Sequence, residues 1–217
     1  ILSGDISTST SGLSEQVLCN FKEEKRADFV ADYYAIPLQM IPPDRPSIGV
    51  QAYTSAAIER ELGIRQGTPI AYRAGDQPNN AFSLNVLDSG EIAATGGTSG
   101  LVYGVTDQPK ADPLSRVNTF LHVNHSAEKP RYGVLLCING TGILNAWIRR
   151  QVAPEMGYDE INRLCETVGP GSDGLVMLPF GNGAERMLEN RYTGASVSGI
   201  DLNRHGRAHI LRAAQEG

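Results

Sequence analysis

The chain has 217 residues and a formal net charge of −5 at pH 7. Hydrophobic residues make up 41% of it and charged residues 20%, which is typical of a globular domain and excludes a disordered or fibrous chain. The acidic balance lacks the basic surface of a general nucleic-acid binder, and no apolar run approaches the roughly 18–20 residues of a membrane helix. We therefore expect neither a nucleic-acid partner nor a membrane partner.

The first part of the chain, up to residue 45, is predicted to be mostly helical. Apolar spacing predicts three helices between residues 1 and 65, over residues 11–18, 27–34 and 54–62. Four prolines between residues 37 and 46 interrupt regular structure and mark a candidate linker. The third helix has Thr54 as its predicted N-cap and Gly63 as its predicted C-cap.

From Gly67 onwards strands and helices are mixed. Short apolar runs predict strands over residues 69–75, 91–95, 101–105, 119–123, 132–138 and 174–179. Helical spacing predicts helices over residues 77–87, 142–151, 158–168 and 208–217. The second and third strands flank a glycine-rich turn, which predicts a hairpin. Antiparallel strands combined with helices indicate an α/β or α+β protein with a mixed sheet.

The ends of the chain and its cysteines indicate what kind of molecule it is. The three cysteines are an odd number, lie far apart and form no C-x-x-C pair, so they indicate neither a disulfide framework nor a zinc site, and we expect a cytoplasmic protein. The chain opens at Ile1 without Met and closes on a helical pattern, so we expect a piece of a longer protein. The apolar residues of the closing helix are then expected to be exposed and to promote association, which leaves a homodimer open.

Asp76 and Gln77 lie where a predicted strand passes into a helix. Side chains at such strand ends point into clefts in open α/β sheets. The carboxylate of Asp76 is therefore a candidate to accept a proton from a substrate hydroxyl, and the amide of Gln77 to bind a second hydroxyl. The alternative is that Asp76 is simply the N-cap of the helix, a position that Asp favours.

Two glycine-containing turns are candidates for binding phosphate. The turn over residues 95–100 has glycines that allow close backbone approach, and the hydroxyls of Thr98 and Ser99 can donate to phosphate oxygens. It is not a Walker A loop, because no Gly-Lys-Ser/Thr follows. The turn over residues 139–142 precedes a helix, whose N-terminal amides attract anions. An ordinary hairpin turn and a plain strand–helix loop are the alternatives.

His122 and His125 straddle the end of a predicted strand, with no carboxylate or Cys beside them in a metal-ligand pattern. We therefore expect no metal site and interpret both as structural or surface residues. Cys137 lies in an apolar strand and is expected to be a small buried hydrophobic residue. A nucleophile pair of Cys137 and His122 leaves a Cys- or His-dependent hydrolase as an alternative function.

The order of these stretches carries more information than any one of them. In chain order they are GTPI at 67–70, AGDQ at 74–77, GTSG at 97–100, LPF at 178–180, GAER at 183–186 and LRAAQEG at 211–217. This ordered set resembles the FGGY carbohydrate kinases, and within them the xylulokinase branch most of all. The resemblance covers essentially the whole chain and places it in the middle of a protein about twice as long.

The resemblance implies an actin-like, RNase H-type ATPase fold of the α/β class, in which two lobes enclose ATP and a sugar. Residues 1–45 would be the end of the first lobe, and residues 46–217 the start of the second. The implied reaction is ATP-dependent phosphorylation of a sugar hydroxyl, with D-xylulose as the expected substrate and glycerol, ribulose, rhamnulose or gluconate as alternatives. A non-catalytic nucleotide-binding module of the same fold is the alternative from another class.

The resemblance also implies roles for individual residues. Asp76 would be the general base and a sugar contact, and Gln77 would occupy the neighbouring sugar-contact position. The residues implied for nucleotide phosphates are Gly97, Thr98, Ser99 and Gly142. ATP and Mg²⁺ are the implied co-reactants. The family's first phosphate loop and its adenine loop are not among these 217 residues, so we expect this chain alone to be inactive.

Overall fold

The structure, a computed structural model, describes all residues from Ile1 to Gly217 and divides into two compact units. The first unit consists of Ile1–Ala93, Tyr103–Ala111 and Asn118–Leu135. The second unit consists of Ala94–Val102, Asp112–Val117 and Leu136–Gly217. The boundary expected at residue 45 lies inside the first unit, and the assignment of residues 1–45 and 46–217 to two lobes stays a prediction.

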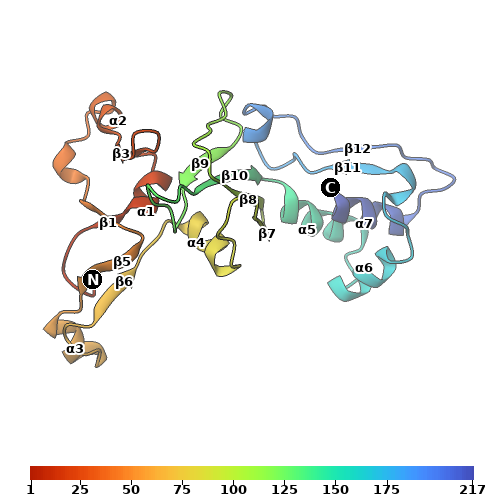
Figure 1. Cartoon of the computed structure of the whole chain (residues 1–217). Helices are drawn as coiled ribbons and strands as arrows, with labels where there is room; N and C mark the ends of the chain where they lie inside the picture. Colours follow the sequence, from red (N-terminus) through yellow and green to blue (C-terminus); the bar gives the residue numbers. More distant parts are fainter. The chain divides into compact units, whose positions relative to one another are not determined.

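The first unit opens with short elements (Figure 1). They are β1 (Thr8–Ser9), α1 (Thr10–Glu15), β2 (Cys19–Asn20), β3 (Lys25–Arg26), α2 (Asp28–Tyr33), η1 (Leu38–Met40) and β4 (Asp44–Arg45). The two predicted α-helices are present, and Leu13, Ala31 and Ile41 form a small core between these elements. The prediction that the chain up to residue 45 is mostly helical is wrong, because this segment also contains four short strands and the loops that join them. The proline-rich stretch is not a linker, because it contains β4, which pairs in parallel with β1.

A hairpin and two helices follow in the first unit. They are β5 (Ile48–Tyr53), α3 (Ala56–Leu62), β6 (Pro69–Tyr72) and α4 (Asp76–Ser83), with β5 antiparallel to β6. The predicted N-cap of α3 is wrong by one residue: Ser55 caps the helix, since the hydroxyl of Thr54 donates instead to the carbonyl of Arg65. Gly63 has the left-handed conformation of a C-cap, with φ of 69°, which confirms the prediction.

A four-stranded sheet has the order β7-β8-β10-β9. Its strands are β7 (Ile92–Gly96), β8 (Gly100–Thr106), β9 (Asn118–Leu121) and β10 (Tyr132–Ile138). β9 and β10 are antiparallel, with Tyr132 opposite Leu121. All four strands and the glycine-rich turn between β7 and β8 were predicted, because each strand is a short apolar run bounded by turn residues.

The second unit contains three helices and a pair of short antiparallel strands (Figure 1), with α7 packed against α5, α6 and β11. Its elements are α5 (Thr141–Val152), α6 (Tyr158–Cys165), η2 (Ser172–Gly174), β11 (Val176–Leu178), η3 (Arg186–Leu188), β12 (Ser196–Ser198) and α7 (Arg207–Glu216). The core gathers one apolar face from each helix: Leu144, Ile148, Ala153, Ile161, Cys165, Leu175, Met177, Leu211, Ala213 and Ala214.

The closing helix differs from the expectation. Leu211 and Ala214 of α7 are buried, with 1% and 4% of their surface exposed, because α7 packs on α5, α6 and β11 of its own unit. The expected exposure of these apolar residues is therefore wrong, and the argument for association that depended on it no longer holds. No helix of the structure is long and apolar enough to cross a lipid bilayer.

Candidate active site

Asp76 is the first residue of α4 and is exposed. The N-cap of this helix is Gly75, so the alternative in which Asp76 is the cap is wrong. The side-chain amide of Gln77 donates to Oδ1 of Asp76 at 2.9 Å, so the structure brings the two predicted sugar-contact residues together. This bond orients the carboxylate at the exposed start of the helix.

Two side chains of α1 accept hydrogen bonds from the backbone at the start of α4. The amide of Gly75 donates to Oγ of Ser11 at 3.2 Å. The amide of Asp76 donates to Oε2 of Glu15 at 2.6 Å, and that of Gln77 to Oε1 at 2.9 Å. Sequence reasoning missed Ser11 and Glu15, because Glu15 lies 61 residues before Asp76 and no local pattern links them.

The predicted phosphate-binding residues of the second unit lie together. The amide of Gly97 donates to the carbonyl of Ser99 at 3.0 Å and closes the turn between β7 and β8. The amide of Ile143 in α5 donates to the carbonyl of Thr98 at 3.2 Å. A Cβ atom on Gly142 would overlap the carbonyl oxygen of Gly97. The turn and the start of α5 are therefore in direct contact.

The start of α5 has the features of an anion site. Its N-cap is Gly140, and no side chain caps the helix, so its first amides have no side-chain acceptor. Thr98 beside it is exposed. Gly142 was expected to be the first residue of this helix. It is the second residue of α5, because the helix begins at Thr141.

A buried carboxylate holds the segment that leads into α5. Glu185 has no exposed surface, and both of its carboxylate oxygens accept the amide of Asn139, at 3.2 and 3.1 Å. The side chain of Asn139 donates to the carbonyl of Ala184 at 3.0 Å. Beside this contact, Gly140 packs on the carbonyl of Pro179 with no room for a Cβ atom. Sequence reasoning did not find this network, since the residues of each pair are more than 40 positions apart.

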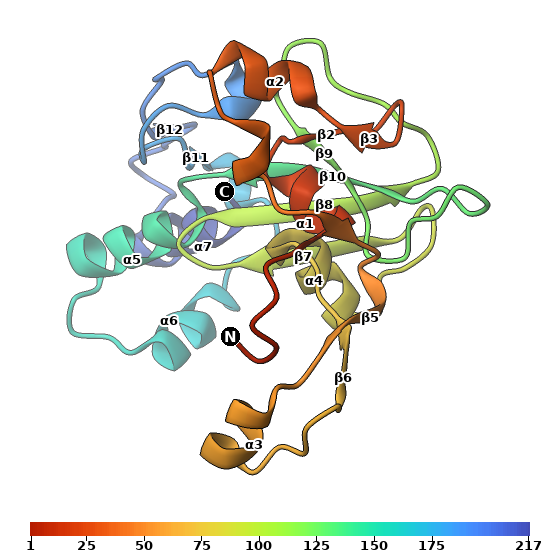
Figure 2. The ribbon, with the colours of Figure 1, turned by 90° about the vertical axis from the view of Figure 1, so that its left-hand side faces the viewer.

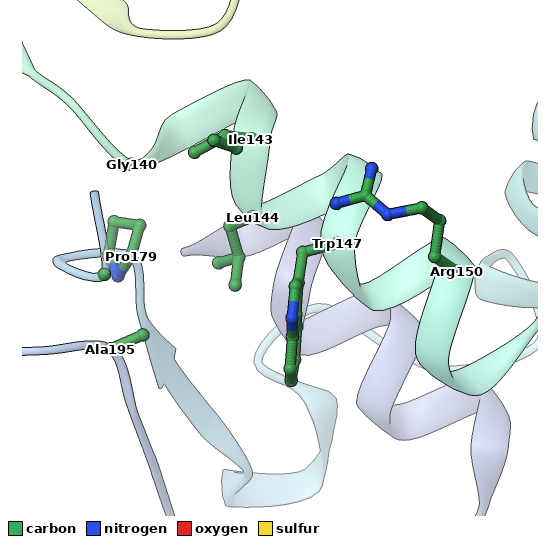
Figure 3. A pocket seen from close by; sticks show the side chains of 8 residues that line it. Gly140, Ile143, Leu144, Trp147, Arg150, Pro179 and Ala195 are labelled. Carbon is green, nitrogen blue, oxygen red and sulfur yellow. The ribbon is translucent and has the colours of Figure 1, made fainter.

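A pocket of about 220 Å³ opens on one face of α5 (Figure 3). Leu144 and Trp147 of α5 face it from one side, and Pro179 and Ala195 from the other. Arg150 is the charged residue among those that line it. Half of the surface of Trp147 is exposed. The lining is mostly apolar, and sequence reasoning did not predict this pocket.

The geometry does not support a thiol or imidazole nucleophile. The carbonyl of Val86 can only accept, so Nε2 of His122 carries the proton and donates to it at 3.0 Å, while the hydroxyl of Tyr103 donates to Nδ1 at 3.1 Å. Both ring nitrogens are thus occupied. Cys137 is partly buried and not fully buried as predicted. This burial and the charge of Glu185 raise the pKa of Cys137, and burial together with neighbouring carboxylates raises that of Cys19 to about 11. Both thiols therefore stay protonated and unreactive near neutral pH.

Comparisons with known proteins give sugar kinases as relatives of this chain. A gluconokinase from Bacillus subtilis (strain 168) is 29% identical over 201 residues, which cover 86% of this chain and 38% of that protein. A xylulose kinase from the same organism is 23% identical over 218 residues, which cover 100% of this chain and 42% of that protein. The crystal structure of xylulose kinase from Rhodospirillum rubrum superposes with a TM-score of 0.83 at 25% identity, covering 98% of this chain and 42% of that chain.

The chain is a homologue of the FGGY carbohydrate kinases. Its fold is the actin-like ATPase fold of FGGY kinases, which confirms the predicted α/β class. It spans about two fifths of the length of the FGGY relatives it matches. No protein-family model matches the chain. The relatives include a gluconokinase, a xylulose kinase and a glycerol kinase, so the similarity to FGGY kinases does not separate these substrates.

Proposed function

We propose that the complete natural protein transfers the γ-phosphoryl group of ATP to a hydroxyl of a sugar or sugar acid. The observation that carries this proposal is the exposed carboxylate of Asp76, oriented by Gln77 at the start of α4, in a chain related to sugar kinases. D-Xylulose, which would give D-xylulose 5-phosphate, and D-gluconate are the first acceptors to test, because relatives with both names match the chain. Glycerol, ribulose and rhamnulose complete the panel.

In this proposal Asp76 is the general base. The acceptor hydroxyl oxygen attacks the γ-phosphorus, the bond from that phosphorus to the ADP oxygen breaks, and the hydroxyl proton passes to the carboxylate of Asp76. The protein's main contribution in such a reaction is to position the reactants and stabilise charge. Gln77 would hold Asp76 in place and contact the sugar.

The turn at Gly97–Thr98–Ser99 and the start of α5 would hold the nucleotide phosphates. The donors present fit that role: exposed Thr98, glycine backbone that an anion can approach, and the amides of Thr141 and Gly142, which no side chain caps. Gly142 would let the turn and the helix meet the same phosphate group.

Mg²⁺ would arrive with the nucleotide in this scheme. No group of three or more His, Cys, Asp or Glu residues in the structure is arranged to hold a metal ion. Mg²⁺ commonly keeps several waters and binds through substrate phosphates with one or two carboxylates, so it does not need such a cluster. When bound, Mg²⁺ supplies positive charge that offsets the negative charge of the phosphates. A cytoplasmic location and a homodimer stay predictions.

The test is an ADP-release assay of the complete natural protein against this panel, with wild type and Asp76→Asn compared. We expect turnover on one acceptor and a loss of about 10²- to 10⁴-fold in Asp76→Asn, because a positioned base is removed. Asp32→Asn, a matched change of an exposed Asp in α2, should leave the rate unchanged. Nucleotide binding without turnover on any acceptor would instead favour the non-catalytic module.

A further inference from the structure

The carboxylate of Glu15 spans two successive backbone amides at the start of α4. Its Oε2 accepts from Asp76 at 2.6 Å and its Oε1 accepts from Gln77 at 2.9 Å. We propose that Glu15 is a positioning residue, which fixes the backbone of Asp76 and thereby the direction in which its carboxylate points. This inference rests on the proposed function, since the direction of Asp76 matters for catalysis only if Asp76 is the base.

Glu15 does not act alone, because α1, which lies beside α4 (Figure 2), supplies a row of acceptors formed by the side chains of Ser11 and Glu15. Ser11 lies four residues before Glu15, so both side chains emerge on one face of α1. Oγ of Ser11 accepts from the amide of Gly75 at 3.2 Å. Three consecutive amides at the start of α4 therefore donate to α1.

The acceptor row is itself held in place. Ser11 has no exposed surface, its hydroxyl meets that of Ser47 at 2.7 Å, and its amide donates to the Ser47 hydroxyl at 3.2 Å. Ser9 caps α1 by accepting from the amide of Gly12 at 3.1 Å. Because these partners are fixed, α1 is a support that can hold α4 in one position.

The contact also requires glycine at position 75. A Cβ atom on Gly75 would overlap Oε2 of Glu15 and approach the carbonyl of Ser11 to 3.2 Å. A larger residue would push the carboxylate of Glu15 away from the amides. Gly75 is thus explained by the close approach of Glu15, and not by an unusual backbone angle, since its φ is −63°.

The charge of Glu15 suits this position. A carboxylate is favourable at the positive end of a helix, and its hydrogen bonds to backbone amides are stronger than those of a neutral acceptor. Because these amides already have an acceptor within the protein, the start of α4 is not available to bind a phosphate. The group that α4 presents outward is the side chain of Asp76.

The experiment compares Glu15→Ala and Glu15→Gln with wild type in the complete natural protein. Glu15→Ala removes both acceptors, whereas Glu15→Gln keeps one oxygen and a similar shape. Glu61→Ala, a change of an exposed Glu in α3, is the matched control. The readouts are kcat, the KM for ATP, the KM for sugar, and amide hydrogen exchange at residues 75–77.

We expect Glu15→Ala to lower kcat by about 10- to 100-fold with the KM for ATP unchanged, since a displacement of about 1 Å at a reacting group can cost this much. Exchange at residues 75–77 should become faster, and Glu15→Gln should lie between wild type and Glu15→Ala in both readouts. If Glu15→Ala does not fold, a lowered kcat in Glu15→Gln carries the same meaning.

Two results would overturn the inference, and they can be told apart. Active wild type with unchanged kcat in both variants would remove Glu15 as a positioning residue and leave the kinase function standing. No turnover by wild type on any acceptor would overturn the proposed function and, with it, any catalytic role for Glu15, and the exchange data would then report only whether Glu15 caps α4.

Discussion

Gly142 in α5 lies directly against the backbone carbonyl oxygen of Gly97 in the turn between β7 and β8. A hydrogen bond of 3.2 Å from the amide of Ile143 to the carbonyl of Thr98 reinforces this contact. The turn and the first residues of the helix are 40 or more positions apart in the chain, yet their backbones touch. We therefore expect a phosphate group bound at the turn between β7 and β8 to lie beside the first amides of α5.

The first prediction concerns Gly142→Ala. The added methyl group has no room beside the carbonyl of Gly97, so the helix and the turn must separate. We expect affinity for ATP to fall at least about tenfold, a change of about 1.4 kcal/mol. Isothermal titration calorimetry checks this, with Gly169→Ala as control, because a Cβ atom on Gly169 meets no neighbour within 4 Å. Equal affinity in both variants would show that the contact does not shape a phosphate site.

The second prediction concerns Glu185. Glu185→Ala removes a buried carboxylate and leaves the partly buried amide of Asn139 without its acceptor, which should lower the free energy of unfolding by about 2–3 kcal/mol. Glu185→Gln keeps one acceptor oxygen and should lower the free energy of unfolding by less than Glu185→Ala does. Urea denaturation of the three proteins measures the order, and a Glu185→Ala protein as stable as wild type would refute it.

The third prediction is a pH dependence that originates at His122. Burial lowers the pKa of His122 from its ordinary value of 6.5. As the pH falls below that value the unfolded chain takes up a proton that the folded chain does not, so the free energy of unfolding decreases. Above the ordinary pKa of 6.5, His122 contributes no pH dependence to the free energy of unfolding.

The slope due to His122 is at most about 1.4 kcal/mol per pH unit. His122→Gln cannot titrate and should lose that part of the slope, although it is expected to be less stable at every pH because the two hydrogen bonds change. Urea denaturation at about pH 7.5 and about pH 5.5 gives the slopes. Identical slopes in wild type and variant would assign the pH dependence to other groups.

The fourth prediction concerns the end of α3. Gly63 has φ of 69°, a conformation that costs other residues about 1–2 kcal/mol. Gly63→Ala should lower the free energy of unfolding by about 1 kcal/mol. Gly63→Asn should lower the free energy of unfolding by less than Gly63→Ala does, because Asn tolerates this conformation better than Ala. Thermal unfolding followed by circular dichroism ranks the three proteins, and equal midpoints would contradict the ranking.

Much of the secondary structure could be predicted, because local signals determine it. The hairpin of β7 and β8 and the helix α5 follow from short apolar runs, glycine turns and helical spacing within each segment. β1 to β5 and β12 were not predicted. β4 has only two residues, and it is a strand only because β1, which is distant in the sequence, pairs with it.

The site could be predicted in part. Asp76, Gln77, Thr98 and Gly142 were identified because each stands in a short stretch with its own signal, and the resemblance to FGGY kinases ordered those stretches. Glu15 and Glu185 were not identified as supports, since each carboxylate bonds a backbone amide more than 40 residues away. Every residue except proline has a backbone amide, so the residue type does not indicate which amide a distant carboxylate will bind. Such pairs are found only from the fold.

The pocket beside α5 contains an intrinsic fluorescence probe. Trp147, which lines it, is the single tryptophan of the molecule and belongs to the second unit. Tryptophan emission therefore reports on the second unit alone, whereas far-ultraviolet circular dichroism records helices and strands in both. If the two signals change at the same urea concentration, the two units unfold together. If tryptophan emission changes at a different urea concentration from the circular dichroism signal, the two units unfold independently, each in its own cooperative transition.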